Sequence, residues 1–133
     1  MHEKLFTIDE ARAAIVHLRE PLTTVRDQRE ALVGLYPRIA PASANAQHNG
    51  GSAYGPQYIE HAIQFAEAIE EVEQSGAIVK DLSAGLVDFP HEHEGRIVYL
   101  CWKLGEDELG WWHEIEDGYA GRQRIEEAFE ESH

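Results

Sequence analysis

The feature that most constrains the fold is a change in the spacing of apolar residues at Gly76. Before it, apolar residues recur every three or four positions, which is the spacing of amphipathic helices. From Ala77 onwards, short apolar runs alternate with turn residues, which is typical of consecutive antiparallel strands. We therefore predict an α+β fold: a long antiparallel helical hairpin followed by a small antiparallel meander sheet of three to four strands.

The first helix is expected over residues 7–36. Thr7 and Glu10 have the spacing of a capping box, in which each side chain satisfies a free backbone N–H of the first turn. The apolar seam from Ile8 to Tyr36 keeps its phase across Pro21, so we expect a kink near Pro21, with two shorter helices as the alternative.

A flexible loop and a second helix are expected next. Residues 37–54 are rich in Pro, Ala, Ser, Asn and Gly, and they predict a flexible loop. The second helix, 56–75, begins at a proline and is ended by Gly76. Its expected apolar stripe is Ile59, Ala62, Ile63, Ala66, Ile69 and Val72. Two helices joined by one loop pack as an antiparallel hairpin.

The sheet is expected within residues 77–115. Its predicted strands are Ala77 to Asp81, Leu86 to Phe89, Arg96 to Trp102 and Leu109 to Ile115. The turns expected between them are Ser83 to Gly85, Glu92 to Gly95 and Gly105 to Asp107. A C-terminal segment, 116–133, follows, and from Gln123 we expect a short helix or a frayed tail. The chain of 133 residues fits a single domain over 1–133.

The charge balance limits the classes of molecule that we expect the chain to bind. The chain has 25 acidic and 11 basic residues and a net charge of −14, which repels phosphate backbones and anionic lipid. We therefore expect neither nucleic acid nor membrane as a partner. Cys101 is the one cysteine, so no disulfide can form within the chain, and the N-terminus lacks a secretory apolar segment. These features favour a cytoplasmic protein.

The strand from Arg96 to Trp102 predicts self-association. Its alternating positions are apolar on both faces, with Ile97, Tyr99 and Cys101 on one and Val98, Leu100 and Trp102 on the other. Both faces should then be covered. The helical hairpin covers one face, and the other requires the C-terminal segment or a second subunit. With the long helical seam, this pattern predicts a homo-oligomer, most simply a dimer.

Asp88 and His113 are candidate site residues. His113 shares a strand face with apolar residues, where we favour a structural role over ligand binding or proton transfer. Asp88 shares a face with Leu86, and a buried carboxylate needs a partner, which His113 or Arg122 could supply. Such a pair serves either the fold or general base chemistry, and a further alternative is that Asp88 is an exposed turn residue.

Three weaker signals remain. Arg122 follows a glycine-rich segment, where an arginine can grip an anion or, as we favour, form a salt bridge. His91 and His93 alternate and could hold zinc, although we favour a solvated turn. Cys101 lies in an apolar run with no adjacent cation, so we expect a buried, unreactive thiol.

Seven short stretches of the second half of the chain resemble a known family. They are Val79 to Leu82, Gly85 to Pro90, Gly95-Arg96, Val98 to Trp102, Leu104 to Glu106, Trp112 to Glu114, and Gly118 with Gly121 to Gln123. The family that they resemble is the bacterial one known as domain of unknown function 2203. The opening from Phe6 to Arg12 is also similar. The resemblance implies a cytosolic bacterial protein of unassigned activity. It directs attention to the matching residues Asp88, Trp102, His113, Glu114 and Arg122, and His91 and His93 lie outside its motif.

Three functions fit these observations. The leading one is a dimeric interaction or regulatory module that associates through the helical hairpin. The second is a protein, or enzyme, that binds a small anionic ligand around Asp88, His113 and Arg122, with aromatic walls from Trp102 and Trp112. The third is a metal protein that uses histidines and carboxylates. The sequence leaves cofactors, and whether the protein is an enzyme, open.

Overall fold

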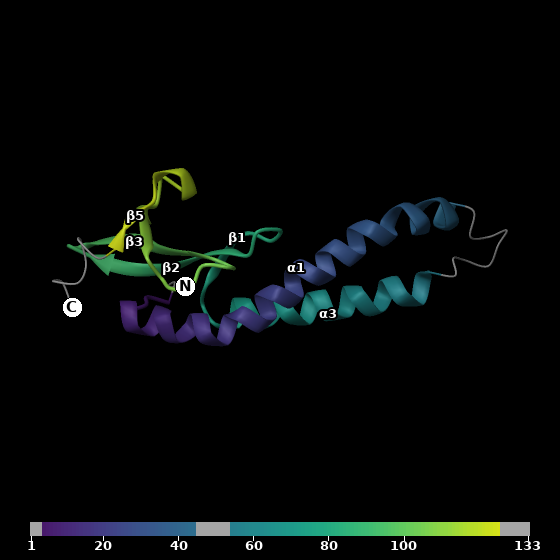
Figure 1. The fold of residues 1–133 in the computed structure, drawn as a ribbon, viewed down its shortest axis with the longest axis horizontal. Helices are drawn as coiled ribbons and strands as arrows, with labels where there is room; N and C mark the ends of the chain where they lie inside the picture. The colour runs from purple at the N-terminus through teal and green to yellow at the C-terminus, as the bar shows by residue number, and fades with distance from the viewer. Residues whose placement is uncertain (1–3, 45–53, 126–133) are drawn as a thin grey trace.

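The computed structural model describes residues 4–44 and 54–125. Two helices, α1 (Ile8–Ala44) and α3 (Gly55–Gln74), pack side by side as a hairpin, and a sheet lies against one end of it (Figure 1). The predicted α+β architecture is confirmed. Among the described residues, neither helix is both long and apolar enough to cross a membrane.

The start of α1 forms as its sequence predicts. The backbone N–H of Thr7 donates to Glu10 Oε1 at 2.8 Å, and the N–H of Glu10 donates to Thr7 Oγ1 at 3.0 Å. These two bonds make the predicted capping box. The helix then continues through Pro21 without ending there, so the alternative of two shorter helices is wrong.

Helix α1 ends later than predicted, so the expected loop starts too early in the sequence. We expected it from Pro37, whereas α1 continues to Ala44. The segment after Pro37 has alanine at 40, 42 and 44, and alanine has the highest helix propensity, which offsets part of the cost of the interior prolines Pro37 and Pro41. The remainder of the expected loop, 45–53, lies outside the described residues, and α3 begins at Gly55 with a proline in its first turn.

The apolar stripe predicted for α3 is only partly buried. Val72 is buried, but Ile59 and Ile63 are each more than half exposed. The side of α3 that packs inward is instead marked by Ala68 and Val72, four residues apart.

Five strands form one antiparallel meander rather than the three to four expected. They are β1 (Ile78–Asp81), β2 (Leu86–His93), β3 (Arg96–Lys103), β4 (Trp111–Glu114) and β5 (Gln123–Arg124), hydrogen-bonded in sequence order. The expected helix or tail from Gln123 is thus a strand at its first two residues, and residues 126–133 lie outside the described part. A short 3-10 helix, η1 (Tyr119–Gly121), precedes β5.

The β2–β3 turn is tighter than predicted. Glu94 and Gly95 have φ angles of 52° and 80°, the two positive values that a two-residue hairpin turn requires. His91 and His93 are therefore strand residues, not turn residues. The turn also fixes the register, which places Asp88 opposite Cys101.

The hydrophobic core lies between the sheet and the hairpin. Its sheet residues are Val87 and Phe89 of β2, Val98, Leu100 and Trp102 of β3, and Trp112 of β4. Residues of α1 from Ile8 to Leu22 and Val72 of α3 pack against them, and Phe6, Ala77, Leu109 and Ile125 complete the core. The chain start joins β2 directly, because the N–H of Phe6 donates to the carbonyl oxygen of Pro90 at 2.7 Å. The alternating residues of these strands face away from the helices.

Candidate functional site

The sheet face that points away from the helices carries a buried polar cluster. Asp88, Cys101 and His113 come from the neighbouring strands β2, β3 and β4, and one donor atom from each lies within 4.8 Å of the other two. Asp88 pairs with Cys101, and His113 pairs with Tyr99 two positions earlier on β3. The three side chains therefore meet because strand alternation and register align them.

His113 is held at both ring nitrogens. Its Nδ1 lies 2.7 Å from the carbonyl oxygen of Glu114, and its Nε2 lies 3.1 Å from both carboxylate oxygens of Asp88. A carbonyl oxygen only accepts, so Nδ1 carries the proton of this bond. The contact with Asp88 then needs one further proton, on either Nε2 or the carboxyl. The pair therefore holds a proton between its two members.

Asp88 is almost wholly removed from solvent, with 1% of its surface exposed. Burial raises the pKa of its carboxyl above the ordinary value, and the charge and hydrogen bond of His113 act in the opposite direction without cancelling the rise. The carboxylate is thus costly in this position unless a cation or a proton compensates it.

Cys101 is not placed as a nucleophile. Burial, followed by the charge of Asp88, raises the pKa of its thiol to about 12, and Arg122 only partly opposes this shift. The thiol therefore keeps its proton at neutral pH. Both nitrogens of His113 are already engaged, so the imidazole has no free position from which to accept the proton of Cys101. This arrangement does not support thiol catalysis.

Arg122 covers the cluster from the C-terminal segment. Its Nη1 lies 3.8 Å from Cys101 Sγ, and its guanidinium donates to both carboxylate oxygens of Glu106, at 3.3 and 2.7 Å. The guanidinium also stacks over the rings of Trp111 and Tyr119, with centroids at 4.6 and 4.2 Å. The C-terminal segment therefore covers the second sheet face around Cys101, which is part of the cover that the sequence required.

Two of the five candidate residues lie elsewhere. Trp102 points into the core, where its indole N–H donates to the carbonyl oxygen of Glu106 at 3.1 Å. Glu114 accepts two bonds from Arg96, at 2.9 and 2.6 Å. The aromatic walls predicted from Trp102 and Trp112 are wrong, because both tryptophans belong to the core.

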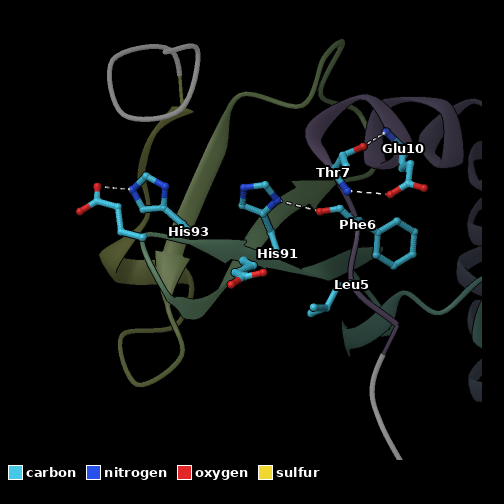
Figure 2. A pocket seen from close by; sticks show the side chains of 8 residues that line it. Leu5, Phe6, Thr7, Glu10, His91 and His93 are labelled. Carbon is cyan, nitrogen blue, oxygen red and sulfur yellow. Dashed lines mark hydrogen bonds and ion pairs between the residues drawn. The ribbon is translucent and has the colours of Figure 1, made fainter. Parts of the chain in front are cut away.

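His91 and His93 line a different pocket, next to the start of α1. Figure 2 shows the His91 ring beside Phe6 and the His93 ring farther from Phe6 along β2. His91 Nδ1 lies 2.7 Å from the Phe6 carbonyl oxygen, and His93 Nε2 lies 2.9 Å from Glu94 Oε2. Within residues 4–44 and 54–125, no group of three metal donors includes either histidine. The geometry therefore does not support a metal site at this pair.

Sequence reasoning missed four contributors: Cys101 as a donor, and Glu106, Trp111 and Tyr119 as the surroundings of Arg122. The register of β2 against β3 contains the signal for Cys101. A two-residue turn at Glu94-Gly95 pairs positions whose numbers add to 189, among them Asp88 and Cys101. No comparable rule links Glu106 to Arg122, since each follows an irregular segment.

The family comparison covers almost all of the chain. The model of the family described as "Uncharacterized conserved protein (DUF2203)" matches residues 4–125. The chain belongs to this family. The comparisons with curated proteins and with solved structures find no match. The DUF2203 match includes every residue of the cluster and both helices of the hairpin.

Proposed function

We propose that this DUF2203 protein binds a divalent metal ion of the zinc class through Asp88, Cys101 and His113. The observation that carries the proposal is the convergence of three different metal donors from three adjacent strands, within 4.8 Å of one another. Sulfur, imidazole nitrogen and carboxylate oxygen are the ligand atoms that zinc takes in proteins.

The geometry needs only a small adjustment to fit the ion: the wider separations within the 4.8 Å group have to shorten, and the His113–Asp88 contact has to open slightly. Bonds of about 2.0–2.3 Å to a tetrahedral zinc place ligand atoms about 3.3–3.8 Å apart. Nε2 of His113 and the oxygens of Asp88 are already 3.1 Å apart. The Nδ1 proton of His113 is donated to the Glu114 carbonyl, which leaves Nε2 as the ligand atom and fixes the ring orientation.

The charges also balance. A zinc ion with one thiolate, one carboxylate and a neutral imidazole has no net charge, which suits a buried position. The ion would displace the thiol proton of Cys101 and the proton shared by Asp88 and His113, so binding should release about two protons. The Arg122 guanidinium beside the sulfur is itself neutralised by Glu106.

The burial of the three donors favours a structural role for the metal, with water in the fourth coordination position that the three donors leave open. Asp88 and His113 are 1% and 3% exposed, and Arg122 covers the remaining side. A metal in this position would join β2, β3 and β4. A thiol ligand must stay reduced, so we also propose that the protein works in a reducing compartment such as the cytoplasm.

The anion-binding alternative has less support. An arginine that grips an incoming anion needs its donors free, whereas Arg122 already donates to both oxygens of Glu106. No observation on the described residues favours this function over metal binding.

The experiment is a titration of metal-stripped, reduced protein with Zn²⁺, followed by calorimetry and thermal unfolding. Zinc at about a hundred times its Kd should stabilise the wild type by about 2.7 kcal/mol. Cys101→Ser should abolish this response, because a serine hydroxyl is a poor zinc ligand. His17→Asn is the matched control, since His17 is an exposed histidine on α1, and it should respond as the wild type does.

A second control tests the other histidine pair. The double variant His91→Asn with His93→Asn should keep zinc binding. The proposal fails if the wild type does not respond to zinc, or if the double variant loses binding while Cys101→Ser keeps it.

A further inference from the structure

The hairpin is longer than the sheet that covers it. Its free end, which we call the arm, consists of residues 26–39 of α1 and 55–67 of α3. Figure 1 shows the arm extending well beyond β1, the sheet strand nearest to it. No described residue of the arm is buried, whereas the remainder of α1 has buried residues in every turn from Ile8 to Val25.

The face of α1 that packs on the sheet continues into the arm without a cover. Eighteen residues make five full turns of an α-helix, so residues 18 apart share one angular position. Ile15 and Val33 are such a pair, and so are Leu18 and Tyr36. Ile15 and Leu18 are 3% and 2% exposed, whereas Val33 and Tyr36 are 57% and 59% exposed.

The other helix of the arm is also apolar on its surface. Ile59 and Ile63 are four residues apart, lie on one side of α3 and are each more than half exposed. Between the two helices, the arm has polar contacts: Gln28 donates to Gln64 at 3.0 Å and also bonds to His61. Apolar residues of both helices, among them Leu32, Leu35 and Phe65, are half-buried, while Val33, Tyr36, Ile59 and Ile63 remain more than half exposed.

The charges of the two helices indicate what covers this surface. The α3 part of the arm carries Glu60 and Glu67 and no lysine or arginine, whereas the α1 part of the arm carries Arg26, Arg29 and Arg38 against Asp27 and Glu30. Among the described residues, no ion pair joins α1 to α3. The α1 surface of one copy is therefore complementary in charge to the α3 surface of another.

We propose that the arm is the dimer interface of this protein, and that a second copy of the chain covers it. Two arms packed with opposite directions form a four-helix bundle, in which α1 of each copy lies against α3 of the other. Each arm is about 20 Å long and two helix diameters wide. The pairing buries Val33, Tyr36, Ile59 and Ile63.

The test is sedimentation equilibrium over a range of protein concentrations. The wild type should have twice the monomer mass of 15.0 kDa. Val33→Glu and Ile63→Glu should each raise the dimer dissociation constant at least tenfold, and together they should give a monomer. Val16→Glu is the matched control, because Val16 is a valine of the same helix that is 69% exposed outside the arm.

Helical content from circular dichroism and the unfolding temperature show whether each variant has folded. A wild type that stays monomeric at about 100 µM, or a Val16→Glu variant that dissociates as readily as Val33→Glu, would overturn the proposal. A monomeric wild type would mean that a second copy of the chain does not cover the arm and that a different partner does. The zinc titration reports on the sheet face alone, so the two proposals can fail separately.

Discussion

The two ends of the hairpin carry similar apolar patterns in different surroundings. At the base, Ile15 and Leu18 pack under the sheet, whereas Val33 and Tyr36 occupy the same helix positions in the arm and stay exposed. The helix therefore does not decide which of its residues form a core. A residue of the helix becomes buried only where another layer packs against it, and the sheet is too short to cover the whole of α1.

The largest expected effect comes from comparing the matched positions directly. Ile15→Ala should destabilise the protein by about 2–5 kcal/mol, because it opens a cavity in a packed core. Val33→Ala should cost less than about 1 kcal/mol in the monomer, where the side chain has little to contact. Chemical denaturation of both variants at a concentration low enough to dissociate dimers measures the difference. Equal losses would show that the arm is packed within one chain.

A smaller loss of stability is expected at Arg122, which covers part of the sheet face that points away from the helices. Arg122→Lys should lower stability by about 1–3 kcal/mol, because lysine cannot donate to both oxygens of Glu106 or stack on Trp111. Arg124→Lys is the control, since Arg124 also lies over Trp111 but is exposed. If Arg122→Lys is as stable as the control, the C-terminal segment does not fix this face.

The smallest effect concerns the start of the base. Thr7→Ala removes the hydroxyl that accepts from the N–H of Glu10, which should cost about 1 kcal/mol. Thr23→Ala is a suitable control, because its hydroxyl bonds to the carbonyl of Arg19 within the same helix and caps nothing. Thermal unfolding of both variants should separate them. A neutral Thr7→Ala would mean that the packing of Phe6 alone fixes the helix start.

Much of the fold could be predicted from local signals. The capping box at Thr7 and the change of spacing at Gly76 depend on neighbouring residues only, and both gave the right structure. The end of α1 could not be predicted in this way, because Pro37 and the alanines after it favour opposite outcomes and no rule on single residues ranks them.

The candidate site was harder to predict from the sequence than the fold was, for a different reason. Asp88 and His113 could be paired as a hypothesis, but the convergence of Cys101 with them depends on a register that one misplaced turn conceals. Reading Glu92 to Gly95 as a four-residue turn hides the pairing that Glu94-Gly95 sets. Arg122 was correctly expected to face a carboxylate, yet its partner is Glu106 rather than Asp88.

The bond from Phe6 to Pro90 has a consequence for the order in which the protein folds. β2, β3 and β4 are consecutive in the chain, so their pairing closes only short loops, and all three proposed metal donors lie within that segment. Phe6, by contrast, is separated from its partner Pro90 in the sequence by both helices of the hairpin. Closing that long loop costs more entropy, so we expect the meander to form early and the N-terminal residues to dock late.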